Sequence, residues 1–312
     1  MAITADKRGY VAGKYAIELD GIMAGWVGSV EGGHATSDVV QEKLGPDHII
    51  HKHLAGVKYE DISVSCGTGM SKGFYEWLKA SFDHNYQRKS GAIIAADFNY
   101  KEHSRLTWHH GLITEIGFPA LDAGSKDAAK MTIKISPEYT RQTTSTGGPS
   151  IAGGKYALGK MEQKKWLPSN FRIKIDGTDC SKVNKIEAIT VKQKVVEHAV
   201  GEMRDYEKEP AHLEIPNLVV TLAESHCKEF YDWHKEFVID GKNDDGKERG
   251  GSLEYLTPDL TTVLFTINFK HLGIFKLTPE KVEAGSENIR RVKAEMYCED
   301  LDFKYGGGAA FA

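Results

Sequence analysis

The sequence predicts an α+β protein, mainly antiparallel β, made of two tandem β-barrels that each have a flanking helix. The first observation is a repeat: Phe74-Tyr75-Glu76-Trp77 recurs 156 positions later as Phe230-Tyr231-Asp232-Trp233. The second is that segments with alternating apolar and polar residues, typical of half-buried strands, surround both copies. A repeat this long indicates two copies of one domain, because solenoid repeats run about 20–50 residues.

The residues around the tetrapeptide keep the same spacing. Asp20-Gly21 aligns with Asp176-Gly177, and Val64 aligns with Val220. Late in each copy the spacing becomes 161, where the alternating segment 131–135 aligns with 292–296. The second copy has therefore gained about five residues in its late loops.

Composition describes a soluble, core-forming protein. The 312 residues suggest about two domains of roughly 100–200 residues, and 40% hydrophobic with 27% charged residues is ordinary for such domains. No run of about 18 apolar residues is present, and the start of the chain lacks the apolar stretch of a secretory signal. We expect the chain to stay in the cytoplasm or to leave by another route.

Charge is unevenly distributed along the chain. Residues 1–156 contain seventeen basic and seventeen acidic residues, so the net charge of −4 falls on the remainder. A neutral half followed by an acidic half gives no basic footprint for sequence-specific nucleic-acid binding.

Composition shifts predict the boundaries. Residues 1–13 are expected to form an N-terminal arm, 14–140 the first domain, 141–166 a flexible linker, 167–305 the second domain and 306–312 a loose tail. The linker is rich in Gly, Ser, Thr and Lys, and about 23 flexible residues span ~26 Å.

Strands and turns follow in a regular order. Alternation or apolar runs predict strands, and Asp20-Gly21 predicts a tight turn between the first two. The Gly-rich stretch 66–69 is expected to be a turn that leads into the helix. Predicted strands are 15–19, 26–30, 62–66, 92–96, 107–108, 112–118 and 131–135 in the first copy, and 252–255, 263–267, 272–275 and 292–296 in the second.

Each copy contains one amphipathic helix. Phe74, Trp77, Leu78 and Phe82 form one apolar stripe, which Phe230, Trp233 and Phe237 repeat, and Ser225 is the expected N-cap of the second helix. The stripes are expected to face the cores. Truncating either tryptophan to alanine should then cost about 3–5 kcal/mol and collapse only its own domain.

Each copy also has a long polar excursion. Residues 31–53 and 187–213 are short of core residues, and the second stretch is strand-like from 190 to 196. Connections longer than about 12–15 residues in a compact domain are usually functional. We interpret both as arms that grip a neighbour.

No group of residues has the pattern of a catalytic or cofactor site, so none is assigned as catalytic, cofactor-binding or metal-binding. The thirteen histidines include His51 and His53, the adjacent His109 and His110, and His226 and His234 around the second helix, but none has zinc-ligand spacing. Gly67-Thr68-Gly69 and Gly147-Gly148-Pro149-Ser150 lack a phosphate-loop pattern, and Glu60-Asp61 is typical of a solvated face. The four cysteines, Cys66, Cys180, Cys227 and Cys298, have no CxxC pair and are expected to be buried free thiols.

Several short motifs resemble a known family. In order they are Asp20-Gly21, the segment 54–59, Phe74-Tyr75-Glu76-Trp77, and the loop 116–123 that includes Pro119. The sequence resembles the tail-tube proteins of contractile phage tails and related injection systems. Ala55 stands where the family often has proline, and the second copy lacks the Pro119 loop, having Phe275-Lys276-Leu277-Thr278-Pro279 instead.

The resemblance implies a non-enzymatic structural protein, without a cofactor, whose small barrels join into rings and stack into a hollow tube. It implies self-association and contacts with other tail, sheath or baseplate proteins, without a membrane. DNA or effectors would pass through the lumen without sequence-specific binding. The implied location is a virion tail or an injection particle assembled in the bacterial cytoplasm. The rival interpretation is a tandem β-barrel module that binds a metal or small ligand through its histidines.

The duplication also bears on ring size. If six barrel positions close a ring, three chains with alternating domains would suffice. In the other arrangement six chains place their first domains in one ring and their second domains in the next. Composition leaves both open, and we expect the three-chain ring.

Overall fold

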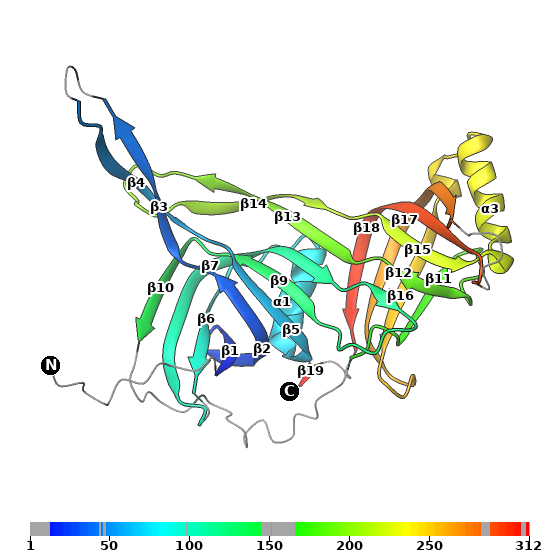
Figure 1. Cartoon of the computed structure of the whole chain (residues 1–312), viewed down its shortest axis with the longest axis horizontal. Coiled ribbons are helices and arrows are strands. Elements are labelled where there is room, and N and C mark those ends of the chain that lie inside the picture. The colour runs from blue at the N-terminus through cyan, green and yellow to red at the C-terminus, as the bar shows by residue number, and fades with distance from the viewer. Residues whose placement is uncertain are drawn as a thin grey trace.

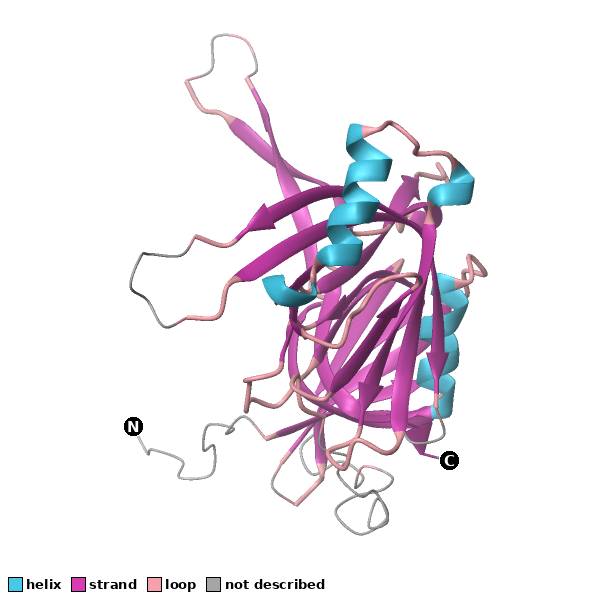
Figure 2. Ribbon diagram, turned by 90° about the vertical axis from the view of Figure 1, so that its right-hand side faces the viewer, coloured by secondary structure: helices cyan, strands magenta, loops and turns pink. Residues whose placement is uncertain are grey.

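The computed structural model describes residues 13–43, 45, 48–97, 99–144, 151, 166–281, 288–306 and 310–311. We call residues 14–144 the first half and 166–306 the second half. Figure 1 shows the two halves side by side, with the first on the left, and Figure 2 shows that strands make up most of the fold. Of the predicted N-terminal arm 1–13, only Gly13 is described.

The first half contains a closed six-stranded barrel. Each strand pairs with the next in the order β7–β6–β1–β2–β5–β9, and β9 returns to β7. Its strands are β1 (Lys14–Leu19), β2 (Ile22–Gly32), β5 (Ile62–Ser71), β6 (Lys89–Ala96), β7 (Glu102–Phe118) and β9 (Met131–Ser136).

Alternation places the barrel core where it was predicted. Ile62, Val64 and Cys66 of β5 are buried, while the serines between them are half-buried. Asp20 and Gly21 join β1 to β2 with φ angles of 50° and 82°, as the tight turn between the two strands requires. The predicted Gly-rich turn at 66–69 is wrong, because β5 continues through it to Ser71.

The second half is an open half-barrel. Its strands follow the order β11–β16–β17–β18–β15–β12, and β12 then pairs with β8 (Leu121–Asp122) of the first half. The strands are β11 (Phe171–Ile175), β12 (Val183–Ile186), β15 (Leu218–Ala223), β16 (Arg249–Leu256), β17 (Val263–Pro279) and β18 (Arg291–Tyr305).

The prediction of two barrels therefore holds for the first half only. β1 and β2 form a hairpin around Asp20-Gly21, whereas β12 is four residues long and begins six residues after Gly177. Residues 178–182 form no strand, so β11 and β12 do not pair and the barrel stays open along this seam.

Two long hairpins correspond to the predicted polar excursions. β3 (Ala35–Glu42) and β4 (His51–Tyr59) form a two-stranded arm that projects from the barrel in Figure 1. β13 (Ile189–His198) and β14 (Glu207–Glu214) form the second arm. This second arm lies on the first half, because β13 pairs with β7 and extends its sheet.

Each half has one main helix. α1 (Lys72–Phe82) begins at the N-cap Ser71, whose side chain accepts a hydrogen bond from the Phe74 amide. α3 (Lys228–His234) continues as a π-helical turn, η2 (Lys235–Ile239), and short 3₁₀ turns lie at η1 (Glu224–His226) and η3 (Asp245–Lys247). The predicted cap Ser225 is wrong: it lies inside η1, and Cys227 precedes α3 without a side-chain cap.

The predicted apolar stripes are confirmed, and one shared core holds both halves. Phe74, Trp77 and Leu78 of α1 are fully buried, and Phe230, Trp233 and Phe237 are also buried. Their cluster contains residues of both halves without a break. The shared cluster predicts that a core mutation destabilises both halves together, in place of the expected collapse of one domain.

The structure also alters the predicted segment ends. β10 (Tyr139–Thr144) pairs with β7 and runs past the boundary at residue 140 into the predicted linker, and Trp166 at the linker's end is buried. In the predicted loose tail, β19 (Ala310–Phe311) pairs in parallel with Met70 and Ser71 of β5. The remaining linker residues, apart from Ile151, lie outside the described part of the chain.

Candidate assembly surfaces

The second arm contacts the first half by adding a strand to the edge of β7. β13 pairs antiparallel with the C-terminal end of β7, with Val191 opposite Ile116 and Thr190 opposite Gly117. Val191 and Ile116 are only 2% and 3% exposed. Ladder hydrogen bonds and buried aliphatic side chains together fix the register of this contact.

Helix α1 also packs between the two halves, at the contact that we call the internal junction. It lies between the barrel and the second half in Figure 1. Phe82 stacks on Phe303 of β18 with ring centroids 5.4 Å apart, and Tyr75 stacks on Tyr305 at 5.5 Å. Phe82 belongs to the predicted stripe, but Tyr75 lies beside it, so the buried surface of α1 is wider than the predicted stripe.

Phe118 lies at the centre of the junction. Its ring centroid is 5.6 Å from that of Phe265 and 5.9 Å from that of Tyr255, both from the second half. Large aromatic contacts of this kind dominate buried interfaces. The junction between the halves is therefore a permanent part of the fold.

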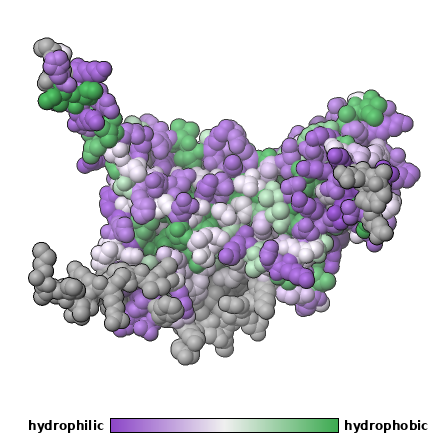
Figure 3. All heavy atoms as spheres, in the orientation of Figure 1, coloured by the Kyte–Doolittle hydropathy of each residue, from purple (hydrophilic) through white to green (hydrophobic). Residues whose placement is uncertain are grey.

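At the far end of the second half, α3 and η2 expose apolar side chains. Tyr231, Val238 and Ile239 are 40%, 45% and 70% exposed, and Phe275 on β17 is 39% exposed. Green, hydrophobic surface gathers at the top of this end in Figure 3. We call the exposed side of α3 and η2, together with residues 275–279 of β17, the outer face of the second half.

The opposite end of the molecule carries the first arm. Val39 and Leu54 are 57% and 67% exposed on β3 and β4, and Figure 3 shows green surface along this arm. Next to it, β10 pairs with β7 on one side only, and its last four residues are exposed. We call the first arm and β10 the outer face of the first half.

The second arm reaches the base of the first. The Tyr59 hydroxyl donates to Asp205 at 3.0 Å, and the Arg141 guanidinium lies 3.7 Å from the same carboxylate. Deeper along the arm, the ammonium group of Lys208, almost fully buried, donates to the Ser136 hydroxyl at 2.9 Å. The second arm thus lies along the first half over much of its length.

The structure brings few of the predicted candidate histidines together. His51 and His53 are both exposed on β4. His109 stacks on Tyr139 at 4.3 Å, and its pKa is lowered by partial burial, while His110 is 2.7 Å from Glu138. Hydrogen bonds and ring contacts of this kind are structural.

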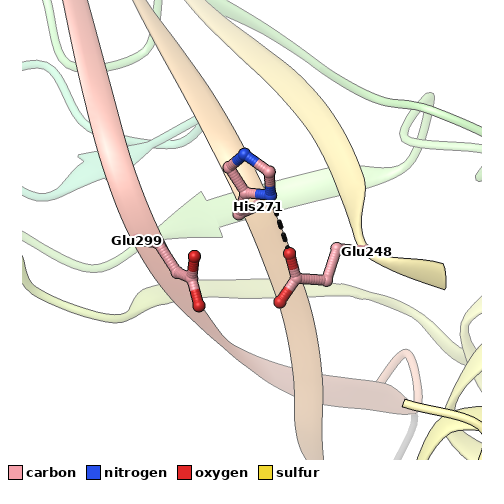
Figure 4. Close-up of side chains that lie close together, drawn as sticks. All are labelled: Glu248, His271 and Glu299. Carbon is pink, nitrogen blue, oxygen red and sulfur yellow. Dashed lines mark hydrogen bonds and ion pairs between the residues drawn. The ribbon is translucent and has the colours of Figure 1, made fainter. Parts of the chain in front are cut away.

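One group with metal-ligand chemistry occurs among the described residues: Glu248, His271 and Glu299, whose nearest ligand atoms lie within 4.8 Å of one another. Figure 4 shows Glu248 and His271 facing each other, and Nδ1 of His271 lies 2.8 Å from Oε2 of Glu248. Tyr297 donates to Oε1 of Glu248 at 2.7 Å. Both oxygens of the buried Glu248 carboxylate therefore have protein partners, which explains the cluster without a cation.

The open seam of the half-barrel forms a shallow groove. It has a volume of about 330 Å³, lies between β11 and the segment before β12, and is lined by both polar and apolar side chains. It includes Arg172, Lys174, Thr178 and Cys180. No convergent set of buried polar groups, as small-ligand sites require, lines it.

All four cysteines are free thiols, as predicted, and three are buried. Burial raises the pKa of Cys66 to about 12 and that of Cys298 to about 11. Cys180, half-buried, has a raised pKa for the same reason. Thiols held neutral in this way are poor nucleophiles.

Sequence reasoning found both arms but missed the exposed side of α3. A signal was available, because the run Phe237-Val238-Ile239 places apolar side chains beyond the width of one buried stripe. It also missed β8 and the pairing of β13 with β7, for which alternation alone offers no signal. Among the described residues, no helix has the length and apolar character needed to cross a membrane.

Comparison with known families gives one match. Residues 11–141, less than half of the chain, match the family model described as T4-like virus tail tube protein gp19. The match covers the closed barrel, the first arm, α1 and part of β10. No curated protein matches the chain.

Several solved structures have a general similarity to less than half of this chain. They include the tube-terminating cap of the anti-feeding prophage, with 18% identity and a TM-score of 0.39, covering 46% of this chain and 100% of that one. The sheath–tube complex of the extracellular contractile injection system PVC has 13% identity and a TM-score of 0.40, covering 45% and 95%. Hcp1 from Flavobacterium johnsoniae has 12% identity and a TM-score of 0.27, covering 44% and 95%.

Proposed function

We propose that this chain is a structural component of a contractile phage tail or a related injection particle, where copies associate into a ring or tube. The observation that carries the proposal is the match of residues 11–141 to the tail tube family. The two outer faces, each rich in exposed apolar side chains or unpaired strand edges, supply the surfaces that such association needs.

We further propose that the second half is a diverged copy of the first. Strand pairing supports this residue by residue: Val30 opposite Val64 corresponds to Ile186 opposite Val220, each 156 positions later. The arms repeat the same way, with bulges between Ser37 and Val39 and between Gln193 and Val195. Matching registers and matching bulges are hard to obtain from unrelated segments, since bulges are particular local features.

The late strands extend the comparison at a spacing of 161. Ile113 opposite Ile135 corresponds to Ile274 opposite Met296, and a register shift follows Ile113 and Ile274 alike. β9 and β10 together correspond to the single strand β18. The second copy has diverged most at the seam, where β12 pairs with β8 and not with β11.

A duplicated chain supplies two barrel-like positions, so three chains would fill a six-position ring with alternating halves. The edge-to-edge strand pairing of the two halves, β13 with β7 and β12 with β8, supports neighbouring positions in one ring over positions in stacked rings. The arrangement with six chains per ring, second halves stacked above first halves, is the competing outcome. Symmetric closure requires that successive contacts be equivalent or nearly so.

The ring would act as a passive conduit and not as an enzyme. A balanced first half and an acidic second half offer no basic track that would hold passing DNA, and acidic effectors would likewise be repelled. Sheath, baseplate or other tail proteins are the expected outer partners. The particle is expected to assemble in the bacterial cytoplasm and to act as a virion tail or injection device.

Electron microscopy of the purified chain over a range of concentrations, with native mass spectrometry, tests the proposal. We expect rings or short tubes with a central opening, in equilibrium with smaller species. A chain that remains monomeric at every concentration and binds a metal ion stoichiometrically would instead support the rival binding module, with Glu248, His271 and Glu299 as the place to look.

A further inference from the structure

We propose that copies of this chain join head to tail by repeating their own internal junction. The outer face of the second half of one copy receives the outer face of the first half of the next. This contact deepens the proposed function and rests on its claim that copies associate. The partner is a second copy of this chain, and the internal junction specifies how it sits.

The internal junction is heterologous, because the two halves contribute different elements to it. The first half contributes α1 and the end of β7, and the second half contributes the second arm together with β16, β17 and β18. At the two ends of the molecule, the equivalent elements have no corresponding half packed against them among the described residues. α3 and the end of β17 lie at one end, and the first arm, β10 and β7 lie at the other, as Figure 1 shows.

Helix α3 keeps an unpartnered copy of the junction face of α1. Tyr75 and Phe82 are 0% and 1% exposed because the second half covers them. Their equivalents 156 positions later, Tyr231 and Val238, are 40% and 45% exposed. The stripe that faces its own half, by contrast, is buried in both helices.

The end of β17 keeps an unpartnered copy of the strand edge on β7. β16 pairs with β17 only between Val263 and Leu272, so within the described residues the outer edge of 273–279 has no strand partner. Leu277 is the equivalent of Ile116 and is half-buried instead of buried. An open edge of this length is a site for strand addition.

The first arm has the strand that fits this edge. Val191 pairs with Ile116 at the internal junction, and the equivalents are Ala35 on the first arm and Leu277 on β17. Lys192 and Glu115 likewise correspond to Thr36 and Lys276. We therefore assign the register between copies: Ala35 lies opposite Leu277, and Thr36 opposite Lys276.

The equivalence ends at the base of the first arm. Gly32 and Gly33 have φ angles of 82° and 81°, in the left-handed region, whereas the equivalent Ile189 is part of strand β13. The arm therefore leaves the barrel at its own angle, and strand pairing between copies begins at Ala35. Thr140 holds this bend by donating a 2.7 Å hydrogen bond to the Gly33 carbonyl.

The contact between copies is more polar than the internal junction. Phe303 and Tyr305 correspond to Gln142 and Thr144 of β10, and Phe118 corresponds to Pro279. Fewer aromatic side chains are available for burial, so this joint is reversible while the internal one is permanent. A heterologous contact of this kind closes into a ring or continues as a filament, depending on its rotation.

Engineered cysteines test the register directly. Residues opposite each other in antiparallel strands have Cα atoms about 4.5–5.5 Å apart, within the range of about 4.4–6.8 Å that a disulfide spans. In a Cys180→Ser background, the pair Ala35→Cys and Leu277→Cys should give covalent oligomers on oxidation. The pair Ala35→Cys and Leu260→Cys is the matched control, because Leu260 is exposed but lies in the turn before β17.

A second variant tests the same contact independently, in case the cysteine variants fail to fold. Val238→Asp places a charge on the outer face of the second half and should raise the concentration needed for assembly by about tenfold or more. Ile22→Asp, at a 72% exposed site at the start of β2, should leave it unchanged. Circular dichroism should show both chains folded.

The outcomes separate the two claims. Rings that form without the Ala35–Leu277 crosslink, or that form equally well with Val238→Asp, would overturn the head-to-tail register and leave the proposed function standing. A chain that never associates would remove both. Crosslinking of the designed pair, absent from the Leu260 control, supports the register.

Discussion

The ring of Phe82 on α1 stacks on the ring of Phe303 on β18, with centroids 5.4 Å apart and planes at 15°. The two residues come from different halves, so this contact ties the halves into one core. Phe82→Ala should lower the free energy of unfolding by about 3–5 kcal/mol, as for other buried aromatic deletions. Denaturant titration followed by tryptophan fluorescence measures this loss.

Val238→Ala is the matched control for that variant. Val238 is the equivalent of Phe82 on α3 but is 45% exposed in the single chain. Its truncation should change the free energy of unfolding by less than about 0.5 kcal/mol, as at most surface sites. Equal losses for Phe82→Ala and Val238→Ala would contradict the difference between the two helix faces.

Trp77 and Trp233 test whether the halves unfold together. Both are buried in the shared core, and the Trp77 indole also donates to the Gln87 carbonyl at 2.8 Å. Each truncation to alanine should cost about 3–5 kcal/mol, and Trp77→Ala should cost slightly more because it also loses a hydrogen bond. Calorimetry should show a single transition shifted downward for each. Two separated transitions, with only one of them shifted, would restore the view of independent domains.

Buried thiols predict a loss of stability in alkali. Burial raises the pKa of the Cys66 thiol to about 12, above the ordinary value of about 8.5. The unfolded chain therefore releases this proton at lower pH than the folded chain does. The stabilisation is fully present below the unfolded pKa and is lost as the pH rises toward the folded one.

Cys66→Ala should remove this pH dependence. One thiol contributes a slope of about 1.4 kcal/mol per pH unit, so between roughly pH 9 and 10.5 the wild type should lose about 2 kcal/mol more than the variant. Urea titrations at the two pH values measure it, and Cys180→Ala, at a half-buried site, should show a smaller difference. Parallel losses in the wild type and Cys66→Ala would contradict a buried, neutral thiol at this position.

Equivalent valines on the two arms give a test of assembly. Val40 and Val196 are 156 positions apart, and both are exposed. Val40→Asp should raise the concentration needed for association, because the first arm is free to meet another copy. Val196→Asp should have a smaller effect, since the second arm already lies on its own chain. Light scattering over a concentration series compares them, and a larger effect from Val196→Asp would contradict the assignment of the arms.

Local patterns in the sequence predicted most helices and strands. The features that were not predicted depend on pairing between strands that are distant in sequence. Alternation located β5 and the late strands, and the apolar stripe located both helices, because side-chain burial sets those periods. Alternation does not say which neighbour a strand edge chooses, so the sequence did not indicate that β13 pairs with β7 or that β12 pairs with β8. The turn expected at Gly67 and Gly69 failed because glycines also occur within strands.

The assembly surfaces were predictable only in part, because local patterns show the arms but not the contacts between distant segments. The polar arms were visible as long stretches without core residues. The burial of Tyr75 was not, because it packs against a sheet that is distant in sequence, and the sequence did not show that Phe82 of the predicted stripe packs on the same sheet. Comparing them with the exposed Tyr231 and Val238 requires the structure.

Cryo-electron microscopy of the assembled particle tests the central claim most directly. The account predicts closed rings of three chains, with first and second halves alternating around the axis and α3 of each copy against β10 of the next. Rings of six chains, in which second halves lie only above first halves, would contradict it.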